Sequence, residues 1–264
     1  MKVTIQNVLD KLMEPVPELA RTVDILLTGN KETLVKGIAT TFLATHDVIQ
    51  QAIDLGVNLL ITHEGLYYSH LDRTGKWTSD PVFLEKKRLI EQSEIAIFRF
   101  HDYIHMYEPD GITSGLIQRL NWETYIEKDY KAASILALPK MPLKEIVSYV
   151  KDKLQIPYVR VAGDLSLGCK RVGISVGYRG GNENSIPLFH QDKIDLLISG
   201  EGPEWETPEY VRDAVQQGLK KALIFLGHAE SEKAGMEYIA QKIQTLFPSI
   251  PVHFIEEKPV FEIL

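Results

Sequence analysis

The chain has 264 residues, 44% of them hydrophobic and 25% charged, a composition typical of a globular protein with one large domain or two small ones. Its formal net charge is −7, so it lacks the basic surface that holds a nucleic-acid backbone, and nucleic acid is disfavoured as a partner. The single cysteine, Cys169, cannot form an internal disulfide. No apolar run approaches the roughly 20 residues that span a bilayer, and the amino terminus lacks the apolar core of a signal peptide. We therefore expect a cytoplasmic protein without a membrane partner.

The first predicted elements are a helix and a buried strand. Residues 47–55 place apolar side chains on one helical face, and Gly56 follows them as a typical C-terminal cap. The short apolar run 59–62 then predicts a strand that is buried on both faces. Asp80-Pro81 begins the next helix, in the usual order of cap and first helical residue, and this helix reaches about residue 92.

The remaining elements continue the same alternation. A strand at 95–100 stops at His101, and a helix runs from Asp110-Gly111 through Leu120. Further strands are predicted at 132–138, 157–162, 170–176, 194–199, 221–226 and 251–255, and further helices at 142–154, 208–217 and 231–246. This order is typical of βαβ units and predicts an α/β fold with mixed sheets and flanking helices.

One phrase of the sequence occurs twice. Residues 57–65 read VNLLITHEG and return as IDLLISGEG at residues 194–202. Each copy is an apolar run that breaks into a Glu-Gly turn, as a buried parallel strand does at the carboxyl edge of an α/β sheet. Such edges hold the sites of α/β proteins, and only the first copy carries a histidine there. We interpret the chain as two similar α/β halves, a pseudo-repeat, with one metal site.

Three strand ends carry side chains that could bind a metal. The first is Thr62-His63-Glu64-Gly65, the second is His101 through His105, and the third is the segment from Gly227-His228 to Glu232. If the chain is helical after residue 228, His228 and Glu232 lie one turn apart on the same side, where an imidazole and a carboxylate can reach one ion.

Each of these residues also has an ordinary structural interpretation. A single histidine at a strand end is more often a hydrogen-bonded loop residue than a ligand, and an acidic residue such as Glu230 favours a helix N-terminus by itself. We interpret His46, His190 and His253 as structural or surface residues. Four of the eight histidines nevertheless lie at or near the ends of three separate strands, beside Asp or Glu, which favours a metal site.

In this order the segments resemble the Nif-three-like dinuclear-metal family, also labelled GTP cyclohydrolase I type 2. The resemblance runs over nearly the whole chain. Besides the three strand ends and the Ser-Gly-Glu of the second phrase, it includes Thr40-Thr41, Gly115-Leu116-Ile117, residues 171–177 and the Gly180-Gly181 turn. It implies two similar α/β halves, two divalent metal ions in the cleft between them, and a ring-like homohexamer. We accordingly expect residues 1–130 to form the first half, 131–226 the second and 227–264 to complete the metal cleft, all within one compact unit.

The ligand positions depart from the family pattern in two places. The family shows two adjacent histidines where this chain has His63-Glu64, and an aspartate where this chain has His105. The two changes exchange a histidine for a carboxylate and a carboxylate for a histidine, which favours a retained site. The resemblance thus implies the metal ligands His63, Glu64, His105, His228 and Glu232. His101 and Asp102 are candidates for orienting a ligand or transferring a proton, and Asp102 stays open as an alternative to His105.

The ligand types indicate the chemistry of the site. Imidazole and carboxylate without thiolate suit two divalent ions of Zn, Fe, Mn or Ni. Two such ions activate water, so we expect a metal-dependent hydrolase acting on a small, nucleotide-like substrate. The turn at residues 177–182 could bind a phosphate, although an ordinary Gly-rich turn is the simpler interpretation. The alternative functions are a non-catalytic metal-binding regulatory protein or metallochaperone, and a scaffold that no longer binds metal.

Overall fold

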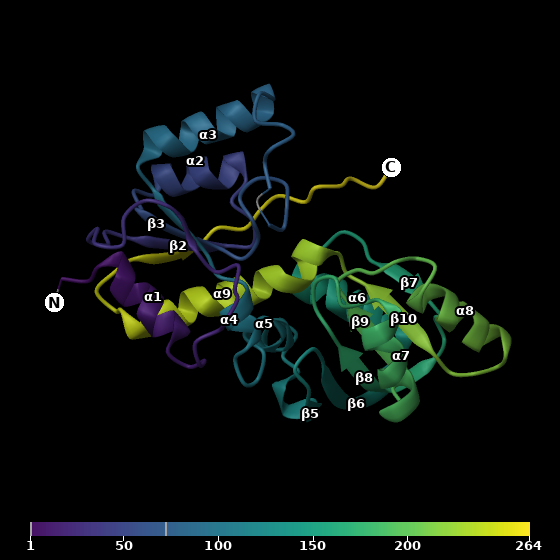
Figure 1. Cartoon of the computed structure of the whole chain (residues 1–264). Helices are drawn as coiled ribbons and strands as arrows, with labels where there is room; N and C mark the ends of the chain where they lie inside the picture. Colours follow the sequence, from purple (N-terminus) through teal and green to yellow (C-terminus); the bar gives the residue numbers. More distant parts are fainter. Residues whose placement is uncertain (1, 72) are drawn as a thin grey trace. The chain divides into compact units, whose positions relative to one another are not determined.

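The computed structural model describes residues 2–71 and 73–264 and forms two compact units (Figure 1). Unit 1 comprises Met1–Tyr107 and Met236–Glu262 with Leu264, and unit 2 comprises Glu108–Gly235 with Ile263. The boundary falls inside α9 (His228–Leu246), so the first part of this helix belongs to unit 2 and the rest to unit 1. Among the described residues, no helix combines the length and the apolarity that crossing a bilayer requires.

Unit 1 is built on a five-stranded sheet. In sheet order the strands are β1 (Leu26–Thr28), β4 (Ala96–Arg99), β3 (Leu59–Thr62), β2 (Ile38–Thr41) and β11 (Val252–Phe254). β1 is antiparallel to β4 and the other neighbours are parallel, so the sheet is mixed. The helices of this unit are α1 (Ile5–Met13), α2 (His46–Asp54), α3 (Pro81–Ser93), α4 (Asp102–His105) and the second part of α9.

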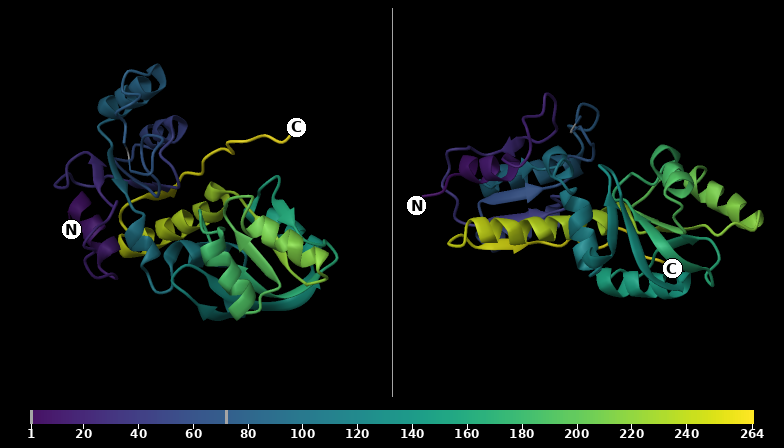
Figure 2. Two further views of the ribbon diagram at one scale, coloured as in Figure 1. Left: turned by 45° about the vertical axis from the view of Figure 1, so that its right-hand side comes forward. Right: turned by 90° about the horizontal axis from the view of Figure 1, so that it is seen from below.

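Helices cover both faces of this sheet, because successive residues of its buried strands point to opposite sides. On one face, Leu60 packs in a cluster with Val48 of α2 and Ile90 of α3. On the other face, the Thr40 hydroxyl donates to the carbonyl of Met236 in α9, at 2.8 Å. Figure 2 shows α2 and α3 on one side of the sheet and α9, in yellow, on the other.

Unit 2 contains a six-stranded sheet. In sheet order the strands are β5 (Ile126–Asp129), β6 (Ser134–Pro142), β8 (Gly168–Ile174), β9 (Leu196–Ser199), β10 (Ala222–Phe225) and β7 (Arg160–Ala162). Only the β8-β9-β10 core is parallel. The helices are α5 (Gly111–Arg119), the short 3₁₀ helix η1 (Glu123–Tyr125), α6 (Leu143–Leu154), α7 (Asn182–Gln191), α8 (Thr207–Gln216) and the start of α9. Leu197 and Leu223 pack against Phe189 of α7 and Val211 of α8, which places these two helices on one face.

The two copies of the repeated phrase occupy corresponding places in the two sheets. β3 lies between two parallel neighbours, β2 and β4, and β9 lies between two parallel neighbours, β8 and β10. All residues of β3 and of β9 are buried, as their continuous apolar runs predict. The predicted α/β fold with mixed sheets and flanking helices is therefore confirmed. The predicted division of the chain into halves, with boundaries at residues 130 and 227, stays a prediction.

The structure also contains elements that the sequence patterns did not indicate: α1, β1, β2, α4, β5 and α7. α7 contains Pro187, which ordinarily argues against a helix interior. α4 spans only Asp102–His105, and one turn is too short to show a helical period.

Candidate metal centre

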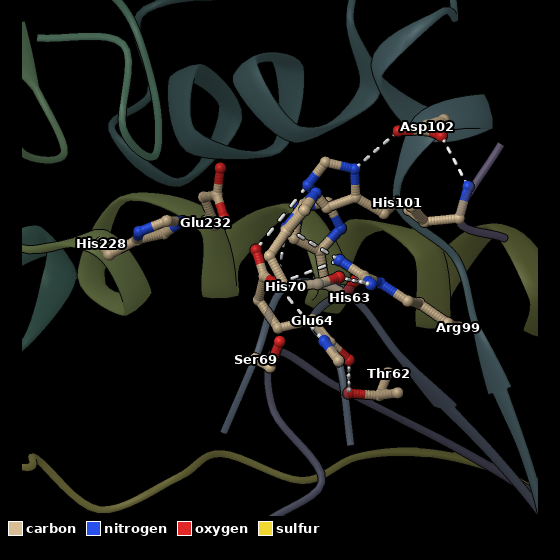
Figure 3. Close-up of polar contacts among 12 residues, drawn as sticks. Thr62, His63, Glu64, Ser69, His70, Arg99, His101, Asp102, His228 and Glu232 are labelled. Carbon is tan, nitrogen blue, oxygen red and sulfur yellow. Dashed lines mark hydrogen bonds and ion pairs between the residues drawn. The ribbon is translucent and has the colours of Figure 1, made fainter. Parts of the chain in front are cut away.

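The first two predicted site segments lie side by side at one edge of the sheet of unit 1. Thr62 and Arg99 are paired in the parallel register of β3 and β4, so His63 and His101 leave the sheet close together. His63 is fully buried. Its ring stacks on that of His101, with centroids 4.6 Å apart. Figure 3 shows the two imidazoles beside Glu64, Arg99 and Asp102.

His105 joins these two imidazoles through α4. Its ring centroid lies 5.0 Å from that of His63 and 5.1 Å from that of His101, in edge-on contacts. The ligand nitrogens of the three residues lie within 4.8 Å of one another. The preceding residue, Ile104, is fully buried. The helix thus sends His105 back toward the strand ends, which is the arrangement expected of a three-imidazole metal site.

Neighbouring acceptors determine which nitrogen of each imidazole can coordinate. His63 Nδ1 lies 3.0 Å from the carbonyl oxygen of Phe100, which can only accept, so Nδ1 carries the hydrogen. His101 Nδ1 lies 2.9 Å from a carboxylate oxygen of Asp102. Both rings therefore keep the coordinating lone pair on Nε2, and Asp102 contacts the opposite nitrogen of the His101 ring.

The electrostatic setting keeps His101 uncharged. Burial, together with the nearby imidazoles of His63 and His105, lowers the pKa of His101 from 6.5 to about 3, although Asp102 and Glu64 act in the opposite direction. A neutral imidazole is the form that binds a metal, because protonation removes the coordinating lone pair. At neutral pH the His101 ring is therefore already in the neutral form that can bind a metal ion.

Asp24 supplies the N-terminal cap that α4 lacks in its own sequence. The Asp24 carboxylate accepts the backbone N–H groups of His101 and Asp102 at 2.8 Å each and that of Tyr103 at 2.9 Å. In return, Asp102 accepts the N–H of Val23 at 2.9 Å. Burial raises the pKa of Asp24 despite these three donors. The segment at residues 23–24 therefore holds His101 and the helix that follows it, which carries His105.

Glu64 is part of a buried ion pair beside the imidazoles. One of its oxygens, Oε2, lies 3.2 Å from the Arg99 guanidinium, whose side chain is 2% exposed, and the other, Oε1, lies 3.7 Å from His101 Nε2. Arg99 also donates to the carbonyl of His70, and one of its nitrogens lies 3.1 Å from His70 Nδ1. Glu64, His70 and His101 form a second group of donors within 4.8 Å.

The third predicted segment forms a separate group within unit 2. His228 Nε2 lies 3.2 Å from Glu232 Oε2 across one helical turn of α9, as the sequence spacing predicts. The other ring nitrogen, Nδ1, lies 2.8 Å from a carboxylate oxygen of Glu201. The Glu232 side chain is nearly buried, whereas those of His228 and Glu201 are about one-third exposed. This is a donor pair of the kind that one ion bridges.

These positions fit a divalent metal. Two ligand atoms that are each about 2.0–2.2 Å from a tetrahedral ion lie roughly 3–3.5 Å apart, and the donor atoms of His228 and Glu232 have that separation. The ligand nitrogens of His63, His101 and His105 lie within 4.8 Å of one another, and His63 and His101 carry their lone pairs on Nε2. All donors are nitrogen or oxygen, which suits Zn, Fe, Mn or Ni.

The sequence patterns missed three polar residues of these groups, namely Asp24, Arg99 and Glu201. Asp24 and Arg99 meet their partners only through the fold and have no local signal. Glu201 stands in the repeated phrase, at the position that Glu64 has in the first copy, and that correspondence could have marked it.

The Gly-rich turn of unit 2 does not offer an open anion site at the start of α7. The Asn182 N–H donates to a carboxylate oxygen of Glu206 at 2.8 Å. A carboxylate of the protein therefore already occupies the place where a helix N-terminus binds a phosphate, which supports the interpretation as an ordinary turn.

Comparisons with known proteins agree with the sequence resemblance. A Clostridium acetobutylicum protein described as a GTP cyclohydrolase 1 type 2 homolog is 24% identical over 228 residues, which cover 83% of this chain and 80% of that protein. A Clostridium perfringens protein with the same description is 23% identical over 250 residues, 90% of each chain. The crystal structure of a Bacillus cereus protein related to NIF3 has the same fold, with a TM-score of 0.80 at 14% identity over 100% of both chains. The profile of the Duf34/NIF3 (NGG1p interacting factor 3) family matches residues 4–259, so this chain belongs to that family.

Proposed function

We propose that this protein binds two divalent metal ions and uses them to hydrolyse a small, nucleotide-like substrate. The observation that carries the proposal is the group of His63, His101 and His105, whose ligand nitrogens lie within 4.8 Å of one another at the edge of a buried sheet. Glu64 belongs to the same edge. His228 and Glu232 are proposed as further ligands, and their assignment to the same centre is a prediction from the family resemblance.

The residues of unit 1 have distinct proposed roles. His63 and His105 are ligands, and His101 is a third imidazole donor that Asp102 orients. Glu64 is proposed to bind metal through Oε1, because its Oε2 is engaged by Arg99. Because Arg99 holds one oxygen of the Glu64 carboxylate, the other oxygen is a single metal donor with a defined direction.

Hydrolysis follows from the kind of ligands in this site. Divalent ions, when bound, supply Lewis acidity toward a water molecule and a substrate oxygen. The half-exposed His70 lies at the solvent side of the imidazoles and could contact a substrate there. The description of two relatives as GTP cyclohydrolase 1 type 2 homologs makes GTP one substrate to test. The runner-up is a metal-binding regulatory protein or metallochaperone without turnover.

Metal binding is tested first, because every version of the proposal depends on it. Protein purified without chelator should contain up to two first-row divalent ions per chain by elemental analysis. His63→Ala and His105→Ala should each lower the metal content, whereas His46→Ala, which changes an exposed histidine of the same unit, should not. Protein that holds no metal and binds none of Zn, Mn, Fe or Ni when these are supplied contradicts the proposal.

Catalysis is tested next, with the bound metal in place. A panel of nucleotides that includes GTP should give turnover that His63→Ala abolishes and His46→Ala preserves. Stable metal binding with no turnover over the panel, together with rapid transfer of the ion to a chelator, would instead favour a regulatory protein or metallochaperone.

The assembly is a separate proposal. The family resemblance implies a ring-like homohexamer, and we retain it for this chain. Light scattering of the full chain should give a hexamer mass that does not depend on concentration, and a monomer at all concentrations contradicts it.

A further inference from the structure

We propose that Glu201 is a positioning residue for His228: its carboxylate holds the hydrogen on Nδ1, so that Nε2 is the nitrogen presented beside Glu232. This inference rests on the proposed metal role of His228. It assigns a task to the Gly-Glu-Gly segment of the second repeated phrase, which the proposed function leaves without one.

The contacts of the His228 ring are the first step of the argument. Nδ1 lies 2.8 Å from Glu201 Oε1, a short distance for a nitrogen donor and a carboxylate. Both ring nitrogens face a carboxylate oxygen, and the Nδ1 contact is the shorter, 2.8 Å against 3.2 Å for Nε2, so we place the hydrogen of the neutral ring on Nδ1. The lone pair is then on Nε2, which lies 3.2 Å from Glu232 Oε2. A neutral imidazole with its hydrogen on Nε2 could not coordinate from that side.

Backbone hydrogen bonds fix the position of Glu201 beside His228. The Glu201 N–H donates to the carbonyl of Gly177 at 2.9 Å, and its carbonyl accepts the N–H of Gly180 at 2.9 Å. A Cβ on Gly202 would lie 2.6 Å from the carbonyl carbon of Gly180, and one on Gly200 would also collide with Gly177. The two glycines thus permit a close approach of the loops, and the residue between them is fixed beside His228.

The backbone of His228, the other residue of this hydrogen bond, is also held by hydrogen bonds. The carbonyl of His228 accepts the hydroxyl of Ser231 at 2.8 Å, and that hydroxyl accepts the N–H of Gly177 at 2.9 Å. The turn that pairs with Glu201 therefore also holds the first turn of α9. The backbone at both ends of the Glu201–His228 hydrogen bond is thus attached to the same loop, which keeps the two residues beside each other.

The first copy of the phrase contains a matching contact. Glu64 has the position of Glu201, and it pairs with Arg99, the last residue of the neighbouring strand β4. Glu201 pairs with His228, which follows the neighbouring strand β10. In both units the glutamate of the phrase contacts a residue at the end of the next parallel strand. The pairing is thus a property of the repeated architecture, and in unit 2 its partner is a candidate ligand.

The test measures the tautomer of His228 and zinc affinity separately, in the full chain. Long-range nitrogen–proton NMR correlations of the metal-free protein, well above the ordinary titration range of histidine, should show His228 with its hydrogen on Nδ1. Glu201→Ala should mix the two tautomers and weaken zinc binding by about 10–100-fold in competition with a chromophoric chelator. Glu201→Gln keeps an oxygen acceptor, so it should retain the tautomer and lose less affinity.

The control is Glu204→Gln, which removes a neighbouring carboxylate that pairs with exposed Arg160. It should change neither readout. The proposal is overturned if Glu201→Ala leaves the His228 tautomer unchanged. It is also overturned if Glu204→Gln mixes the two tautomers as Glu201→Ala does. If Glu201→Ala does not fold, Glu201→Gln decides: a tautomer shifted to Nε2 contradicts the role of the oxygen acceptor. Failure of the metal role is visible independently, because His228→Ala would then leave zinc affinity unchanged while the tautomer result still stands.

Discussion

Arg99 and Glu64 form a buried ion pair directly beside the candidate metal ligands, with a nitrogen–oxygen distance of 3.2 Å and side chains that are 2% and 15% exposed. A histidine at position 64, which the family resemblance implies, could not supply the negative charge that this guanidinium contacts. Glu64 therefore has a structural reason to be acidic in this chain, in addition to its proposed metal role. A buried pair of this kind is costly to break from one side.

Glu64→Gln should accordingly lower the free energy of unfolding by about 3 kcal/mol, because it leaves Arg99 buried without this carboxylate. Urea denaturation of the metal-free protein measures the change. The matched control is Glu85→Gln, which breaks an exposed pair with Arg88 and should have a much smaller effect, because solvent screens that pair. Equal effects of the two substitutions would contradict the importance of burial for the Arg99 pair.

Asp24→Asn should weaken both the fold and the proposed metal site. An amide has a single oxygen, so at least one of the three N–H groups that Asp24 accepts would face an NH₂ group instead. We expect a loss of about 1–3 kcal/mol in stability and a lower zinc affinity, since α4 begins directly after His101 and carries His105. Asp80→Asn is the control, because Asp80 caps α3 in its own chain segment and Asn caps helices equally well. Calorimetry and zinc titration of both variants check the prediction.

The pH dependence of the metal-free protein should reflect His101. Its pKa is about 3 in the folded state and 6.5 as the ordinary value, so the unfolded state binds more protons between these pH values. The contribution of His101 is therefore favourable above pH 6.5, and stability is lost as the pH falls from 6.5 toward 3. His101→Gln should reduce the slope of unfolding free energy against pH in this window by up to about 1.4 kcal/mol per pH unit.

Urea unfolding in the presence of a chelator, repeated across that window, gives the slope. His46→Gln, which changes an exposed histidine, should keep the slope of the parent chain. A His101→Gln protein with the parental slope would show that another group causes the acid sensitivity.

Gly177→Ala should disturb Glu232 specifically. Gly177 has a φ of +58°, and a Cβ there would collide with a carboxylate oxygen of Glu232. Gly218 has a φ of +78° with nothing within 4 Å, so Gly218→Ala measures the backbone strain alone, about 1–2 kcal/mol. We expect Gly177→Ala to cost more stability and also to reduce zinc affinity, with no change in affinity for Gly218→Ala. Comparable zinc titrations of the two variants would argue against Glu232 as a ligand.

The sequence alone determined the elements whose side-chain period or cap is local. The helix before Gly56, the helix that begins at Asp80-Pro81 and the buried strands at 59–62 and 196–199 follow from residues within one or two turns of each other. The pairing of His228 with Glu232 belongs to the same class, because both stand on one helix at a spacing of one turn.

Only the tertiary structure decided which distant residues hold the candidate ligands in place. Asp24 caps a helix 77 positions further on, Arg99 meets Glu64 across 35 positions, and Glu201 meets His228 across 27. Such contacts arise where parallel strands end at a common edge, and a strand pattern predicts the edge without saying which side chains meet there. The sequence therefore determined the types of candidate metal-binding group and their strand ends, while the packing of the strands and loops decided their orientation, tautomer and charge.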